Sequence, residues 1–288
     1  MSDVRRPPAG WYRDPAGQFR QRWWDGDRWT DGVSDKQGVV SQSPLPPEGA
    51  AAAWAALEDH RHRFSAWIAL IAVGAFFLSS IVAGILGYLA SQVNSATGLV
   101  VGAGANYGGL YLTCWLVSRR RGTGNVAQDF GVRYQRGDWW RGVLISFAAR
   151  IAGIVVVAVL VLISKDLAGS NTAAFDEHKD SLGFILCAAV VAVGMAPFFE
   201  ELFFRGLIQQ SLEGSFPVPV AIVGQGALFG LAHLGGAEGI GNIGLVLGLA
   251  AAGMVFGVCA RRFHRIVPGM IGHACFNLPL VIVLLVNR

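Results

Sequence analysis

The sequence predicts an all-α polytopic membrane protein with a small β mini-domain at its N-terminus. Hydrophobic residues make up 53% of the 288 residues and charged residues 15%, and the mean hydropathy is +0.47. Soluble domains carry about 25% charged residues. Long apolar runs begin at Phe64, and three of them contain ionisable or amide side chains. An ionisable side chain at the bilayer centre costs about 2.5 to 3.5 kcal/mol unless it is paired or functional. We therefore expect these side chains to line an intramembrane polar cavity, with seven or eight transmembrane helices around it.

The charge and the cysteines argue against two other classes of protein. The net charge is +4, but most basic residues flank apolar runs, where membrane topology explains them, so we expect no nucleic-acid partner. A secreted disulfide framework would place cysteine pairs in loops. All four cysteines lie inside apolar runs, and we interpret them as small core residues: Cys114, Cys187, Cys259 and Cys275.

Residues 8–33 predict a separate β mini-domain. They are rich in tryptophan, and Asp25-Gly26 between β-prone residues is typical of a tight hairpin turn. We expect two or three strands stacked on the tryptophans. The segment resembles a short Trp-rich domain of unknown function found at the N-termini of many bacterial membrane proteins, and its partner is left open. Residues 34–60, rich in Pro, Ala, Gly and Ser, predict a flexible linker.

Residues 61–288 predict the transmembrane domain. A helix needs about 20 apolar residues to cross the hydrocarbon core. Glycines recur at four-residue spacing in the second and sixth predicted spans, which predicts close helix contacts. An eighth helix is expected if the fourth or fifth span is broken. The seven spans are 64–93, 98–118, 141–163, 182–204, 218–234, 243–260 and 266–286.

The basic residues predict a multi-pass protein of the cell membrane with a cytoplasmic N-terminus. With that orientation only Lys165, Lys179 and Arg288 lie outside, as the positive-inside rule demands. The arginines placed on the cytoplasmic side are Arg61, Arg63, Arg119, Arg120, Arg121, Arg133, Arg136, Arg141, Arg205, Arg261, Arg262 and Arg265.

The fourth span ends in a charged motif. Glu201 and Arg205 are four residues apart and share a helix face, so the arginine can neutralise that carboxylate, while Glu200 points elsewhere. Pro197 lacks a backbone donor and predicts a kink just before the pair. The alternative interpretation is an interfacial Glu–Arg pair where the span leaves the membrane.

The fifth and seventh spans carry the other polar residues. His233 follows Phe229 by four residues, and His273 and Asn277 lie one helical turn apart. A single membrane histidine is more often a hydrogen-bonded packing residue than a catalyst. Peptide hydrolysis, however, needs a base near water and donors where negative charge develops, and a carboxylate, two imidazoles and an amide supply both.

The order and spacing of these blocks resemble those of the CAAX-protease and bacteriocin-processing (CPBP) family of intramembrane proteases. The blocks are a double Glu with Arg four residues after the second, then Phe-x-x-x-His, then His-x-x-x-Asn. The resemblance covers about residues 140–288, the expected protease-like core, and implies a role for each motif residue. Glu200 would activate water as general base, His233 would help to hold the water, His273 and Asn277 would stabilise the oxyanion, and Glu201, Arg205 and Phe229 would be supporting residues.

Whether a metal takes part is open at this stage. Glu200, His233 and His273 could bind Zn²⁺ with water as a fourth ligand, a pattern of hydrolytic zinc sites. The helical motif His-Glu-x-x-His is absent from the sequence. A metal-independent, glutamate-dependent reaction uses the same residues.

The predicted spans leave a geometric problem. At 1.5 Å per residue, Glu200 would lie near the cytoplasmic face and His273 about 10 Å deep, whereas a straight fifth span would carry His233 more than roughly 20 Å from that face. Either the chain between Gln209 and Val220 dips into the protein, or helices tilt and break around a water-filled cavity. We expect such a cavity, open to the cytoplasm.

The sequence therefore predicts an intramembrane endopeptidase that acts on a membrane-associated peptide or protein. A non-catalytic membrane scaffold or a bacteriocin-immunity protein fits the same composition. A transporter is a weaker alternative, because transporters show internal repeats and no convincing repeat is present here.

Overall fold

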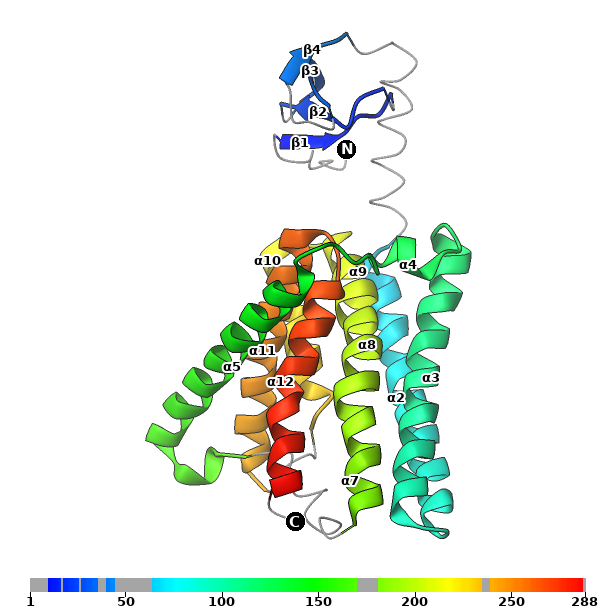
Figure 1. Cartoon of the computed structure of the whole chain (residues 1–288), viewed down its shortest axis with the longest axis vertical. Coiled ribbons are helices and arrows are strands. Elements are labelled where there is room, and N and C mark those ends of the chain that lie inside the picture. The colour runs from blue at the N-terminus through cyan, green and yellow to red at the C-terminus, as the bar shows by residue number, and fades with distance from the viewer. Residues whose placement is uncertain are drawn as a thin grey trace. The chain divides into compact units, whose positions relative to one another are not determined.

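The computed structural model describes residues 10–16, 18–25, 27–35, 40–44, 64–169, 181–234 and 239–286 of the chain (Figure 1). The chain divides into two compact units, Met1–Arg63 and Phe64–Arg288. The first contains a small sheet and the second is helical, as the sequence predicts.

The N-terminal unit is a four-stranded antiparallel sheet in the order β1-β2-β3-β4. Two or three strands ending at residue 33 were expected. The fourth strand lies inside the segment predicted to be linker, where Val-Ser-Gln pairs with the end of β3; most of the rest of that segment lies outside the described residues. The strands are β1 (Gly10–Arg13), β2 (Gln21–Trp24), β3 (Trp29–Ser34) and β4 (Val40–Gln42).

A buried ion pair lies at the centre of this sheet. The Nε of Arg22 lies 2.9 Å from Oδ1 of Asp14, with both side chains fully buried, and Trp24 beside them is also fully buried. Backbone N–H groups of Gln18 and Phe19 donate to the second carboxylate oxygen at 3.0 and 2.9 Å. Burial raises the pKa of Asp14, but Arg22 and these backbone donors outweigh it and hold the pKa below its ordinary value of 3.8.

The second unit is a bundle of helices whose long axes run side by side (Figure 1). Among the described residues, five helical runs are long and apolar enough to cross a membrane: Ala66–Ser91, Asp138–Ile163, Leu182–Glu213, Gly241–Phe263 and Val267–Val286. The elements in order are α2 (Ala66–Ser91), α3 (Ser95–Arg121), α4 (Val126–Asp129), α5 (Asp138–Ile163), η1 (Lys165–Leu167), α7 (Leu182–Ala189), η2 (Val190–Met195), α8 (Ala196–Glu200), η3 (Glu201–Gln209), α9 (Gln210–Glu213), α10 (Val218–Leu231), α11 (Gly241–Phe263) and α12 (Val267–Val286).

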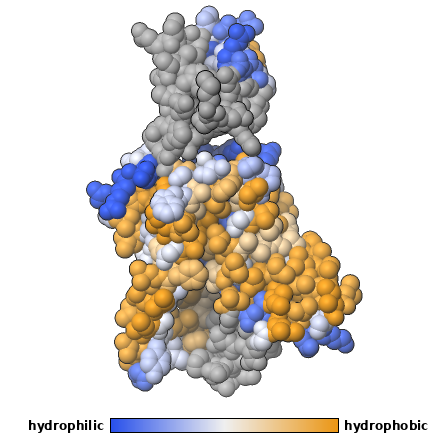
Figure 2. Space-filling view, turned by 180° about the vertical axis from the view of Figure 1, so that it is seen from behind, coloured by the Kyte–Doolittle hydropathy of each residue, from blue (hydrophilic) through white to orange (hydrophobic). Residues whose placement is uncertain are grey.

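Hydrophobic residues cover most of the visible face of the helical unit (Figure 2). Large apolar side chains such as Trp67, Phe77, Phe147 and Ile154 are 60% exposed or more. A water-soluble protein rarely exposes so wide an apolar surface, whereas lipid covers it at no cost. The bundle is therefore that of a multi-pass membrane protein.

The fourth predicted span continues well beyond its predicted end at residue 204. Leu182–Glu213 form one helical run of 32 residues, in which η2 and η3 are π-helical. Pro197 lies at the start of α8, between these two wide segments. The wide turns on either side absorb the irregularity that a proline imposes on a helix, so the helix goes on where the sequence suggested that it leaves the membrane.

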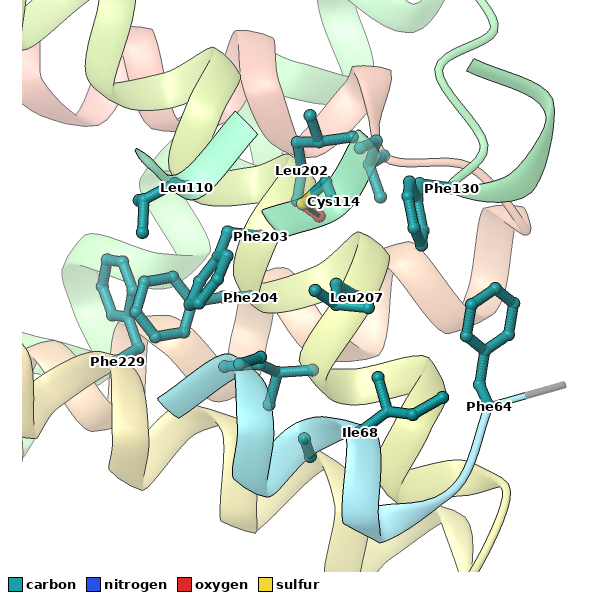
Figure 3. Close-up of a cluster of buried hydrophobic side chains, with 14 of the residues drawn as sticks. Phe64, Ile68, Leu110, Cys114, Phe130, Leu202, Phe203, Phe204, Leu207 and Phe229 are labelled. Atoms are coloured by element: carbon teal, nitrogen blue, oxygen red, sulfur yellow. Dashed lines mark hydrogen bonds between the residues drawn. The ribbon is translucent and has the colours of Figure 1, made fainter. Parts of the chain in front are cut away.

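The hydrophobic core surrounds η3. Every residue from Glu201 to Gln209 is buried. Figure 3 shows its apolar side chains facing those of α2, α3 and α10, together with Phe130 before α5. The segment that carries the charged motif is therefore the central helix of the bundle.

Close backbone contacts hold α10 and α11 beside η3. A Cβ at Gly230 would lie 2.2 Å from the carbonyl oxygen of Val246, and one at Gly226 would lie 2.9 Å from that of Ala250. The predicted close contact of the sixth span is present, since a Cβ at Gly244 would overlap the carbonyl of Leu167. In the second span the prediction holds for Gly98 and Gly102, whose Cβ positions lie within 3.3 Å of backbone atoms of α2, and it fails for Gly104 and Gly108, which have nothing within 4 Å.

The turn between α11 and α12 is tied to the start of α5. Arg265 donates from Nε and Nη2 to the two oxygens of the fully buried Asp138, at 3.1 and 2.6 Å. A bidentate pair of this kind fixes direction as well as distance. It sets the position from which α12 enters the bundle.

We predict that the Asp14–Arg22 pair makes the N-terminal unit acid-sensitive. The pKa of Asp14 is lowered in the folded state, so its ionised carboxylate stabilises the unit at pH values above the ordinary pKa of 3.8. This contribution to folding stability is lost as the pH falls through the folded-state pKa. Asp14→Asn should destabilise the unit by about 3 to 5 kcal/mol at neutral pH and flatten the acid dependence. Amide hydrogen exchange of β2 in the full chain measures both, and exposed Asp31→Asn is the control. Equal acid dependence in wild type and Asp14→Asn would contradict the assignment.

Candidate active site

Glu200, Glu201 and His273 lie together inside the bundle, and His233 lies against Phe229, which itself contacts His273. This arrangement answers the geometric problem of the predicted spans. Glu200 was expected near one membrane face. In the structure 13 further residues follow it in the same helix, about 20 Å of helix at 1.5 Å per residue. The next helix, Val218–Leu231, runs back over about the same distance, and His233 lies in the turn just after its end. The two residues therefore reach a similar depth without a dip of the intervening chain.

Glu201 and Arg205 form a fully buried ion pair. Nη1 of Arg205 lies 2.8 Å from Oε1 of Glu201, and both side chains are 0% exposed. Nη2 donates to the carbonyl of Gly253 at 3.2 Å, and the guanidinium lies 4.3 Å from the ring centre of Phe229. The sequence placed Arg205 among the arginines on the cytoplasmic side, beyond the end of the fourth span, whereas in the structure it lies within the helical run and is buried. Its charge is held inside the bundle by a carboxylate, a carbonyl and an aromatic face.

His273 connects α12 to both glutamates. Its Nδ1 donates to Oε1 of Glu201 at 3.1 Å, and its ring stacks on Phe256. A carboxylate only accepts, so this bond assigns the proton to Nδ1 and directs Nε2 the other way. Nε2 lies 3.9 Å from Oε2 of Glu200, too long for a direct hydrogen bond and suited to one bridging water.

Glu200 has one engaged oxygen and one free oxygen. The hydroxyl of Tyr107 donates to Oε1 at 3.1 Å. Oε2 is buried and makes no hydrogen bond to any described residue, although the side chain as a whole is 14% exposed. A buried acceptor without a partner is costly in a native structure and marks a place where a ligand or water belongs.

His233 reaches the site through Phe229. Its Nδ1 donates to the carbonyl of Phe229 at 2.8 Å, so its Nε2 is also the available nitrogen. The Phe229 ring contacts both imidazoles, with centres 4.9 Å from His233 and 5.7 Å from His273. Among the described residues His233 has no direct polar contact with Glu200 or His273.

Asn277 lies on the same face of α12 as His273 but has a different partner. Its Nδ2 donates to the carbonyl of Ala192 at 2.8 Å, within the π-helical segment η2. This bond ties α12 to the fourth helix. One N–H of the amide remains for an oxyanion.

The proposed zinc ligands do not form a metal site in this arrangement. Within the described ranges no three His, Cys, Asp or Glu side chains lie close enough to hold a metal ion. Glu200 and His273 face each other, but His233 makes no polar contact with either of them among the described residues. The donor set therefore does not fit a three-ligand zinc centre, and we derive no step through a metal.

Several polar residues of the site were missed in the sequence. Tyr107 is one of two tyrosines in the second span, where tyrosine among apolar residues is an ordinary occurrence. Gln225 donates to the carbonyl of Gly253 at 2.9 Å, the same carbonyl that Arg205 uses. Arg150 donates to the carbonyl of Phe276 and lies 4.7 Å from its ring centre. A systematic count of polar residues inside apolar runs would have found the last two.

We predict that Arg205 and Glu201 stabilise the bundle as a unit. Arg205→Met leaves a buried carboxylate without its cation and should cost about 3 to 5 kcal/mol. Adding Glu201→Gln should restore part of this loss, because the second change removes the uncompensated charge. Thermal unfolding of the purified protein in detergent measures the coupling, with exposed Arg262→Met as the control. Strictly additive losses from the two changes would show that the pair does not act as a unit.

Two family models match the chain. Residues 182–279 match the type II CAAX prenyl endopeptidase Rce1-like family, and residues 9–53 match a protein family of unknown function, DUF2510. No match was found among curated proteins or among solved structures. The first match includes the seven motif residues discussed above, and the second covers the whole sheet together with part of the predicted linker. The chain therefore carries an Rce1-like CAAX protease domain within its membrane bundle and a DUF2510 domain at its N-terminus.

Proposed function

We propose that this protein is an intramembrane endopeptidase that hydrolyses a peptide bond of a membrane-associated peptide or protein. The Rce1-like family supports an intramembrane protease. The observation that carries the finer proposal is the free, buried Oε2 of Glu200, which lies 3.9 Å from Nε2 of His273. One water molecule between these atoms would hydrogen-bond to both.

Glu200 is the general base of this reaction. Its Oε2 takes a proton from the water while the water oxygen bonds to the carbonyl carbon of the scissile peptide. The proton then passes to the leaving nitrogen as the C–N bond breaks, so the carboxylate returns to its starting form. General-base catalysis by a placed carboxylate contributes about 10² to 10⁴ in rate.

His273 and Asn277 stabilise the tetrahedral intermediate. Protonated on both nitrogens, His273 donates from Nε2 to the oxyanion while Nδ1 stays bonded to Glu201. Asn277 contributes the amide proton that Ala192 does not use. The Nε2 of His233, whose Nδ1 is bonded to the carbonyl of Phe229, serves in this proposal as a further hydrogen-bonding group for the attacking water. Glu201 and Arg205 support His273 without taking part in the proton transfer.

The substrate enters from lipid, and the N-terminal unit is cytoplasmic in this proposal. The exposed apolar surface of the bundle and the depth of the site favour a peptide bond in or next to the membrane. Arginines gather at one end of the helices, at the end of α3 and the end of α11, and positive residues favour the cytoplasmic side. A polar cavity open to that side would supply water. Prenylated substrates are named in the family description alone.

We predict that Glu200→Gln abolishes cleavage. The amide keeps the size of the carboxylate but takes no proton, so the rate should fall by about 10² or more. Peptidomes of membranes from cells that produce the wild type and the variant provide the comparison, and products present with wild type alone identify the substrate. Asp166→Asn, an exposed carboxylate change in the same unit, is the control. Identical peptidomes for wild type and Glu200→Gln would leave a scaffold or immunity role as the better account.

We predict that cleavage survives removal of metal ions. Zn²⁺ would need three protein ligands, and the described side chains form no such group. Protein stripped of metal ions with a chelator and assayed with the peptide identified above should keep its cleavage rate within about twofold. A metal-dependent enzyme would lose far more, because a catalytic metal contributes several kcal/mol to a hydrolytic transition state. Loss of activity that Zn²⁺ restores would establish the zinc-dependent alternative.

A further inference from the structure

Tyr107 makes two contacts with the turn that carries Glu200. Its hydroxyl donates to Oε1 of Glu200 at 3.1 Å, and its ring lies parallel to that of Phe199, with centres 5.4 Å apart and planes at 12°. The residue is 8% exposed and belongs to α3, outside the stretch that matches the protease family. The bond to Glu200 is the one hydrogen bond that the phenol makes among the described residues.

We propose that Tyr107 is the positioning residue of the catalytic base: it occupies one oxygen of Glu200 and leaves the other, Oε2, to face His273 and take the proton of water. The inference rests on the proposed function. A carboxylate that could turn freely would present either oxygen to water and spend part of its time in unproductive orientations. With Oε1 held, the proton acceptor has one position.

The position of Tyr107 is itself fixed by the packing of α3 against α2. Ser79 of α2 donates to Oδ1 of Asn106, the neighbour of Tyr107, at 3.1 Å. A Cβ at Gly109 would lie 2.4 Å from the Cβ of Ser79, so the two helices touch at this level. The phenol is therefore presented to Glu200 from a rigid helix pair.

The Tyr107 hydroxyl is important because it makes a charge-assisted hydrogen bond to the carboxylate of Glu200. A neutral donor bonded to an ionised carboxylate is worth more than a bond between neutral groups, and it favours the ionised form. Phenylalanine would keep the stack on Phe199 and remove only this bond. The chain offers a matched control in Tyr111, which contacts the same Phe199 edge-on, with centres 6.3 Å apart, but is 41% exposed and makes no hydrogen bond among the described residues.

The first test does not depend on cleavage. Infrared difference spectra of the full-length protein in detergent follow protonation of carboxyl groups, and the band that disappears in Glu200→Gln belongs to Glu200. In Tyr107→Phe this band should appear at higher pH than in wild type, and in Tyr111→Phe it should not move. Fluorotyrosine at position 107, a stronger donor with the same ring, should move it to lower pH. A band that appears at the wild-type pH in Tyr107→Phe overturns the proposal.

The second test uses the peptide identified by the peptidome comparison. Loss of one hydrogen bond to a charged group corresponds to a fall in kcat of roughly 10- to 100-fold, with KM unchanged and the acidic limb of the pH–rate profile moved to higher pH. Tyr111→Phe should behave as wild type. A fall in kcat with an unmoved profile shows a structural role and overturns the proposal. A band that moves in a protein without cleavage supports the Tyr107–Glu200 interaction and overturns the proteolytic function instead.

Discussion

The site depends on the carboxylate of Glu201. One of its oxygens lies 2.8 Å from the guanidinium of Arg205 and 3.1 Å from Nδ1 of His273, and none of the Glu201 side chain is exposed. Charged groups are costly in the interior unless they are paired and hydrogen-bonded. Arg205 balances the charge and also binds the carbonyl of Gly253 in α11. A single carboxylate thus joins the central helix to α12 directly and to α11 through its partner.

The wide turns of η2 and η3 determine where Glu201 and Arg205, and the adjacent Glu200, lie along the central helix. A π-helical turn adds a residue to the helix and rotates those that follow, so the directions of Glu201 and Arg205 differ from those in a regular helix. The carbonyl of Ala192 in η2 is bonded by Asn277 of α12. Irregular backbone inside a membrane persists only where protein satisfies it. The irregularity that Pro197 marks is therefore part of the site.

The sequence predicts this architecture in outline and fails where tertiary contacts decide. Apolar runs of suitable length placed seven helices close to their observed positions, and four-residue spacing correctly paired Glu201 with Arg205. The end of the fourth helix was wrong because the charged motif looked like an exit from lipid, whereas the charges are neutralised inside. Strand β4 was missed because Val40–Gln42 gain their stability from pairing with β3. Tyr107 was missed because its role comes from a contact with a residue 93 positions away.

The side chains of Glu200 and Glu201 have different partners because they point in different directions from the helix. Glu201 turns inward to a cation and an imidazole, and it is held too firmly to move a proton. Glu200 turns toward α3, where the phenol of Tyr107 donates to one oxygen, while the other makes no hydrogen bond within the described part of the chain. Oε2 of Glu201 likewise has no hydrogen-bond partner among the described residues, so the difference lies in the ion pair with Arg205 that neutralises Glu201. The different roles of the two carboxylates therefore follow from their different partners, Tyr107 for Glu200 and Arg205 for Glu201.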